Sequence, residues 1–275
     1  MVNGSKPDTV VLIHGLYLTH HSWEGWIAHY EARGMKVLAP GWPGMEGPVE
    51  EQRRDPSAIA TMRVEDILAH YEKIIGGLDS PPIVIGHSFG GAFMQVLVSR
   101  GLAAVGVGIA AASVRGIRKV PFVTVKSNLS ILRNPFARKR AIMLTREQFH
   151  FGFTNTFPAE AADAAYDKYA VPGSRNVLFT GVNAQLNPKT PLQVDWEKRD
   201  RVPLLFVAGG QDHIVPASVN RANYDKYVKQ NPGAITAYKE YPSRCHGTAF
   251  EPGWEAVADY ALDWASNPIG GIIEG

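Results

Sequence analysis

The residues around Ser88 carry the strongest chemical signal in the chain. An apolar segment at 83–85 runs into Gly86-His87-Ser88-Phe89-Gly90, and residues 90–100 follow with helical spacing. A serine on a sharp strand-to-helix turn projects its hydroxyl from the sheet edge, and glycines two positions away on either side leave room for that turn. The N-terminus of the following helix favours developing negative charge. The pattern therefore predicts that Ser88 is a nucleophile.

A serine hydroxyl is a weak nucleophile unless a neighbouring base takes its proton, and that base needs an orienting acid. With its Gly-x-Ser-x-Gly turn after an apolar strand, the sequence resembles the serine hydrolases of the α/β-hydrolase fold over nearly its whole length. In that family the nucleophile is followed along the chain by Asp or Glu and then by His. The resemblance implies an enzyme that uses neither a cofactor nor a metal ion.

Two later segments match the acid and the base of this family. Asp212 lies in Gly-Gly-Gln-Asp-His-Ile-Val-Pro, directly after the apolar segment 204–208. His246 lies between an expected strand at 236–240 and an expected last helix at 255–265. The resemblance therefore implies Asp212 as the acid and His246 as the general base. His213 is the alternative base, and His150 is an alternative base or a pocket residue.

Acyl transfer also needs donors for the oxyanion that forms on the carbonyl oxygen. The resemblance implies the backbone N–H of Phe89, which follows the nucleophile, and that of Leu16, which follows His14-Gly15 after the apolar segment 9–13. We expect His14 to be a scaffold residue and His87 to pack beneath the turn. His20 and His21 lack the carboxylates or cysteines that would complete a metal site.

Short apolar segments alternate with longer amphipathic ones, which predicts a doubly wound, mostly parallel sheet with helices on both faces. Only eight residues precede Thr9, so the hairpin that often opens the family's sheet should be reduced or missing. About six strands are expected, at 9–13, 36–39, 82–85, 105–110, 204–208 and 236–240. The expected helices are 22–33, 64–76, 90–100, 217–229 and 255–265.

The alternation breaks in a phenylalanine-rich segment, which we expect to be a mostly helical cap inserted over the active site. The predicted cap spans 114–195, with helices at 145–151 and 159–170, and the predicted hydrolase core comprises 1–113 and 196–268. Residues 269–275, which end in Gly-Gly-Ile-Ile-Glu-Gly, resemble the remnant of an expression tag and are excluded from the expected fold.

Composition excludes several other classes of protein. The 275 residues are 45% hydrophobic and 20% charged, which is typical of a globular chain. A net charge of +2, from 28 basic and 26 acidic residues, does not favour a nucleic acid partner. No apolar stretch is long enough to span a bilayer, and a single cysteine excludes an internal disulfide. We expect a cytoplasmic protein; its oligomeric state stays open.

These observations predict a carboxylesterase that acts on small or medium apolar esters through an acyl-enzyme. The same three residues would also support hydrolysis of a lactone, an amide or a carbon–carbon bond, or perhydrolysis. A lyase of the hydroxynitrile type and a catalytically inactive ligand receptor are further alternatives.

Overall fold

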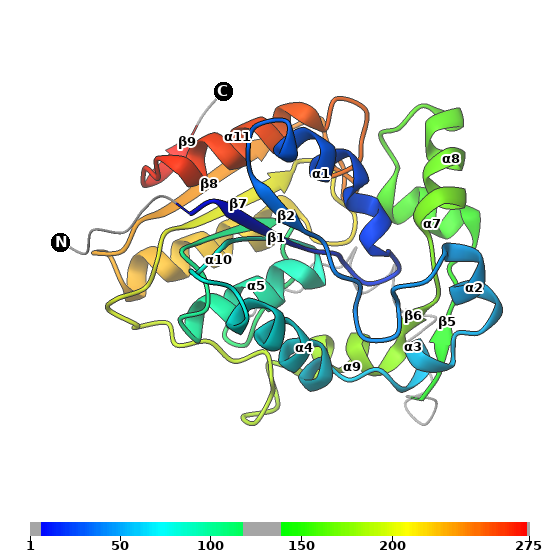
Figure 1. Cartoon of the computed structure of the whole chain (residues 1–275), viewed down its shortest axis with the longest axis horizontal. Coiled ribbons are helices and arrows are strands. Elements are labelled where there is room, and N and C mark those ends of the chain that lie inside the picture. Colours follow the sequence, from blue (N-terminus) through cyan, green and yellow to red (C-terminus); the bar gives the residue numbers. More distant parts are fainter. Residues whose placement is uncertain (1–6, 118–138, 274–275) are drawn as a thin grey trace.

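A seven-stranded sheet forms the centre of the protein. The computed structural model describes residues 7–117 and 139–273. The strand order is β2-β1-β3-β4-β7-β8-β9, and every neighbouring pair is parallel (Figure 1). The strands are β1 (Thr9–Ile13), β2 (Lys36–Leu38), β3 (Ile83–His87), β4 (Val105–Ile109), β7 (Leu204–Gly209), β8 (Thr236–Tyr241) and β9 (Gly271–Ile273). The predicted doubly wound parallel fold is confirmed.

The sheet is covered on both faces because its side chains alternate between two hydrophobic clusters. On β1, Val11 and Ile13 belong to a cluster with side chains of α4, α5 and α10, whereas Val10 and Leu12 pack with those of α1 and α11. These helices are α1 (Glu24–Glu31), α4 (Val64–Gly76), α5 (Phe89–Ser99), α10 (Ala217–Gln230) and α11 (Glu255–Ser266). All five overlap helices predicted from the sequence.

The far end of the chain contradicts its expected exclusion from the fold. Residues Gly271–Ile273 form β9, which pairs with β8 and makes seven strands instead of about six. Ala237 lies opposite Gly271 and Tyr238 lies opposite Ile272. A strand of this length is too short to show a hydrophobic period in the sequence. It forms because the edge of β8 has unpaired backbone N–H and C=O groups to which it can bond.

Residues 139–195 place three helices and a small antiparallel strand pair beyond the end of the sheet toward which β1 runs (Figure 1). The elements are β5 (Ala141–Ile142), α7 (Arg146–Phe153), α8 (Ala159–Tyr169), β6 (Gly173–Ser174) and α9 (Arg175–Asn183). The structure confirms the two predicted helices as α7 and α8. The sequence analysis missed α9, as well as η1 (His20–Trp23), α2 (Val49–Arg54) and α3 (Ser57–Thr61) between the early strands.

Polar contacts tie the predicted cap, of which the structure describes residues 114–117 and 139–195, to the predicted core. The guanidinium of Arg53 in α2 donates to the carbonyls of Ala170 at 2.9 Å and Tyr166 at 2.7 Å, at the C-terminal end of α8. The Ala170 N–H also donates to the Tyr166 carbonyl, at 3.1 Å, so Arg53 adds a second donor there and supplies a side-chain donor to the carbonyl of Ala170, beyond the end of α8. Lys168 of the same helix forms a 2.7 Å ion pair with Glu24 of α1. The C-terminal half of α8 is thus held against α1 and α2.

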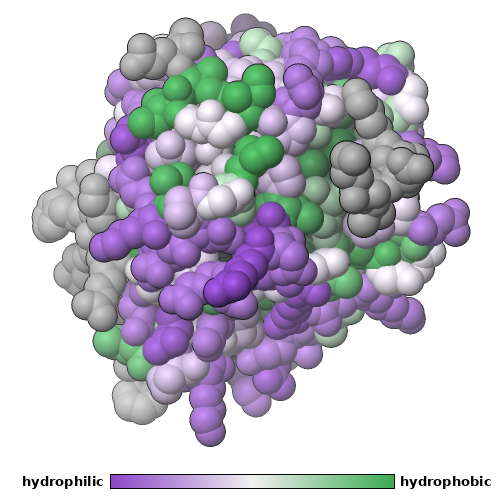
Figure 2. Space-filling model, turned by 90° about the vertical axis from the view of Figure 1, so that its left-hand side faces the viewer, coloured by the Kyte–Doolittle hydropathy of each residue, from purple (hydrophilic) through white to green (hydrophobic). Residues whose placement is uncertain are grey.

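Hydrophilic side chains cover most of the face in Figure 2, and the apolar side chains there form separate patches. Among the residues that the structure describes, the most exposed large apolar ones are Leu186 and Ile269, at 83% and 63%. Across residues 7–117 and 139–273, no helix combines the length and the apolar character that crossing a membrane requires.

Candidate active site

Ser88 lies on a strained turn between β3 and α5. Its backbone has φ 55° and ψ −119°, a conformation that costs a non-glycine residue about 1–3 kcal/mol. Surrounding contacts impose it: the N–H of Ser88 donates to the carbonyl of Ile109 at 3.0 Å. A Cβ on Gly86 would lie 2.1 Å from the Gly90 carbonyl oxygen, and one on Gly90 would lie 2.1 Å from that of Ile13. Both glycines are therefore required for the chain to pass this closely.

Three side chains from distant parts of the sequence meet at this turn. The Nε2 atom of His246 lies 3.0 Å from the Oγ atom of Ser88, and its Nδ1 atom lies 2.7 Å from an oxygen of Asp212. All three residues are buried. Because the carboxylate accepts the proton on Nδ1, the Nε2 atom is free to accept the proton of the serine hydroxyl.

The second oxygen of Asp212 accepts hydrogen bonds from the backbone N–H groups of Ile214 and Val215, both at 2.7 Å. These bonds come from the turn that follows β7, so the strand end and its turn orient the carboxylate. One carboxylate oxygen of Asp212 therefore accepts from the backbone, and the other accepts from the imidazole of His246.

The two expected oxyanion donors flank the serine. Phe89 is the first residue of α5, and its N–H precedes the hydrogen-bonded part of that helix. The loop that contains Leu16 runs beside Ser88, since a Cβ on Gly15 would lie 2.8 Å from the Cβ of Ser88. Over the ranges 7–117 and 139–273, no protein acceptor is bonded to the N–H of either Leu16 or Phe89. The two donors are thus available for a substrate oxygen.

His14 and His87 each form hydrogen bonds with backbone groups around the site. His14 donates from Nδ1 to the carbonyl of Gly15 at 3.0 Å and accepts at Nε2 from the N–H of Trp42 at 3.2 Å, which is the expected scaffold role. His87 donates from Nε2 to the backbone carbonyl of His246 at 2.8 Å. The sequence placed His87 beneath the turn, but nothing in it indicated this contact with the expected base.

The pH dependence of stability should report on these two histidines. Burial lowers the pKa of His14 and of His87 to about 3. The unfolded chain then binds more protons than the folded protein below about pH 6.5, so stability falls as the pH falls. At about 1.4 kcal/mol per pH unit for each histidine, the free energy of unfolding should drop by about 4 kcal/mol between pH 7 and pH 5. Urea unfolding at the two pH values measures this change.

A His87→Gln variant provides the control for that measurement. Glutamine keeps a donor near the carbonyl of His246 but does not titrate, so the loss between pH 7 and pH 5 should be about half as large. An equal loss in both proteins would contradict the assignment.

The remaining candidate histidines lie outside this arrangement. His213 donates from Nδ1 to the carbonyl of Phe151 at 2.8 Å, so it links the acid turn to α7 and does not reach the serine. His150 lies in α7, and His21 contacts Glu24 at 2.9 Å. Within residues 7–117 and 139–273, no group of three or more His, Cys, Asp or Glu residues is arranged to hold a metal ion.

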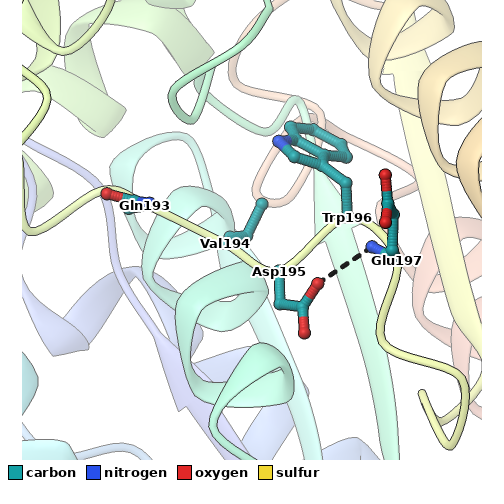
Figure 3. A pocket seen from close by; sticks show the side chains of 5 residues that line it. All are labelled: Gln193, Val194, Asp195, Trp196 and Glu197. Atoms are coloured by element: carbon teal, nitrogen blue, oxygen red, sulfur yellow. Dashed lines mark hydrogen bonds between the residues drawn. The ribbon is translucent and has the colours of Figure 1, made fainter.

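A surface pocket shares no lining residue with this site. It is lined by Gln193, Val194, Asp195, Trp196 and Glu197, five consecutive residues of the stretch before β7 (Figure 3). The carboxylate of Asp195 accepts a hydrogen bond from the N–H of Glu197 at 3.0 Å. None of the five residues is a serine, cysteine or histidine, so none matches the nucleophile or base expected from the sequence.

Phe153, the last residue of α7, is a second contact that the sequence analysis missed. Its ring meets the imidazole of His246 edge-on, with the ring centres 5.0 Å apart. Its carbonyl accepts a hydrogen bond from the N–H of Gly247 at 2.8 Å. The phenylalanine-rich composition of the cap was the available signal, but it does not distinguish this ring from the others.

Comparison with known proteins identifies the family of the chain. The sequence profile of the alpha/beta hydrolase family matches residues 10–259, so the chain belongs to that family. The search of curated proteins gives no match.

Among solved structures, a pyrethroid hydrolase from Sphingobium faniae is similar, with a TM-score of 0.66, 20% identity and coverage of 94% of this chain and 98% of that one. Polyneuridine aldehyde esterase has a TM-score of 0.64 and 19% identity, with coverage of 94% and 98%. A monoacylglycerol lipase from Paleococcus ferrophilus has a TM-score of 0.65 and 18% identity, with coverage of 95% and 96%. At these identities the likeness shows the fold alone.

Proposed function

We propose that this protein is a serine hydrolase that cleaves carboxylic esters through an acyl-enzyme. One observation carries the proposal: Ser88, His246 and Asp212 form a continuous hydrogen-bonded chain, with distances of 3.0 Å and 2.7 Å. A nucleophile, a base and an orienting acid at these separations meet the geometric requirement for acyl transfer.

In the first half-reaction, His246 takes the hydroxyl proton as the Oγ atom of Ser88 attacks the ester carbonyl carbon. Negative charge then develops on the carbonyl oxygen, and the N–H groups of Leu16 and Phe89 stabilise it. Asp212 stabilises the positive charge on the imidazolium. When the tetrahedral intermediate collapses, His246 gives the proton to the leaving alcohol and the acyl group stays on Ser88.

In the second half-reaction, a water molecule attacks the acyl-enzyme. His246 takes a proton from the water, and the same two N–H groups stabilise the second oxyanion. Release of the acid returns the proton to Ser88. Every step uses groups of this chain alone, and the proposed partner is a small-molecule ester.

The surroundings of Ser88 favour an apolar substrate of small or medium size. The half-buried ring of Phe89 lies against Gly181 of α9, where a Cβ would approach the ring to 2.6 Å. Phe153 contacts the imidazole from the cap side, and Tyr17 packs edge-on against Phe153 with ring centres 6.4 Å apart. Apolar rings bind alkyl and aryl groups, and the names of the similar hydrolase, esterase and lipase are consistent with an ester.

A panel of p-nitrophenyl esters with graded acyl chains tests this proposal, with lactones and amides alongside. Because Ser88 is only 4% exposed, short and medium chains should be cleaved fastest, and chains of about twelve or more carbons should be slow. Amides should react far more slowly than the matching esters. A panel in which a lactone, an amide or a carbon–carbon substrate is turned over and no ester is would replace the ester assignment.

A further inference from the structure

The backbone on both sides of His246 is held by groups outside the three proposed catalytic residues. On one side, the N–H of Cys245 donates to the carboxylate of Glu251 at 3.3 Å. On the other side, the N–H of Gly247 donates to the carbonyl of Phe153 at 2.8 Å. The position of the imidazole therefore depends on a loop that is fixed at two adjacent points.

Glu251 joins this loop to the cap. Its Oε2 atom accepts from the N–H of Cys245, and its Oε1 atom accepts from the hydroxyl of Thr156 at 2.5 Å. Thr156 follows α7 in the cap, whereas Glu251 precedes α11 in the core. The Nη1 atom of Arg244 lies 3.8 Å from Oε2. A single carboxylate thus contacts the cap and the residues immediately before His246.

Burial increases the importance of these contacts. Glu251 is 8% exposed and Cys245 is fully buried, so water does not readily replace a lost partner. The thiol of Cys245 donates to the carbonyl of Phe153 at 2.9 Å, at the C-terminal end of α7. The carbonyls at the end of a helix need donors from outside the helix. The His246 loop supplies such donors to the last carbonyl of α7.

From this arrangement we propose that Glu251 is a positioning residue, which holds the imidazole of His246 in line with Ser88 by fastening its loop to Thr156 of the cap. The inference rests on the proposed function, because it concerns the same base. Glu251 does not reach Ser88 or Asp212 in any contact of the described residues. Its effect on turnover therefore passes through the loop.

Steady-state kinetics on p-nitrophenyl butyrate with Glu251→Ala and Glu251→Gln tests the proposal. Alanine removes both fastenings, so kcat should fall about 10- to 100-fold while KM changes less than about threefold. Glutamine can direct its oxygen to the N–H of Cys245 and its amide to the hydroxyl of Thr156, so kcat should stay within about threefold of the wild-type value. A Glu251→Ala protein with wild-type kcat, or a glutamine variant as slow as alanine, would overturn the proposal.

Arg53→Ala is the matched control, since it also cuts hydrogen bonds between the core and the cap but touches no part of the His246 loop. Its kcat should remain within about threefold of the wild-type value, and a fall equal to that of Glu251→Ala would show that loosening the cap is sufficient. If Glu251→Ala does not fold, Thr156→Val tests the cap contact alone, with an expected fall of about 3- to 10-fold in kcat and an unchanged kcat as the contrary result.

A parallel Ser88→Ala sample separates the two proposals. An inactive Ser88→Ala protein beside a fully active Glu251→Ala protein contradicts only the role of Glu251. An active Ser88→Ala protein contradicts the proposed function itself.

Discussion

Replacing Ser88 by alanine should abolish ester turnover, with kcat reduced about 10⁶-fold. The variant loses the hydroxyl that lies 3.0 Å from the Nε2 atom of His246, so no acyl-enzyme can form on residue 88. The backbone strain at φ 55° is unchanged, and alanine fills nearly the same space, so the free energy of unfolding should change by less than about 1 kcal/mol.

Hydrolysis of p-nitrophenyl butyrate, followed together with a thermal melt, tests both parts of this prediction. Ser99→Ala is a suitable control, because Ser99 lies at the opposite end of α5 from Ser88 and its hydroxyl accepts a hydrogen bond from the N–H of Asp195 at 2.7 Å. A Ser88→Ala protein that keeps its activity would exclude Ser88 as the nucleophile.

The second large effect is expected from Asp212→Asn. The N–H groups of Ile214 and Val215 hold one carboxylate oxygen at 2.7 Å, so the asparagine must keep its oxygen there and turn its NH₂ group toward His246. The Nδ1 atom then accepts a hydrogen bond, and the proton moves to Nε2, which can no longer take the proton of Ser88. We expect a fall of about 10⁴-fold in kcat with an intact fold.

The matched control is Asp195→Asn, which changes an exposed carboxylate that also accepts a backbone hydrogen bond, in the pocket of Figure 3. Its turnover should equal that of the wild-type protein. If Asp212→Asn turned over ester at a similar rate, His246 would not depend on this carboxylate for its tautomer.

The sequence was most informative where a local pattern determines a local structure. The central strands and the turn at Ser88 follow from apolar runs ended by glycines, and the structure places the glycines where a Cβ would clash. The chain order of the family then selected Asp212 and His246, which the structure brings into contact with Ser88. Their catalytic roles stay proposals.

The features that were missed depend on contacts between distant segments. The strand β9 forms only because β8 is present, and α9 contains Gly181 and the β-branched Val177, Thr180 and Val182, which favour a helix poorly. His87 and Glu251 gain their contacts through backbone groups of the His246 loop. The sequence around His87 and Glu251 does not indicate these partners, so the contacts can be identified only in the folded structure. The boundaries 114 and 195 of the cap also stay a prediction.

Labelling with a fluorophosphonate probe, followed by peptide mass spectrometry, tests the central claim most directly, because the probe reacts only with an activated serine. We predict a single adduct on Ser88 in the wild-type protein, and at least a hundredfold slower labelling in Asp212→Asn. An unmodified Ser88 in the folded wild-type protein, or an adduct on a different serine, would contradict the account.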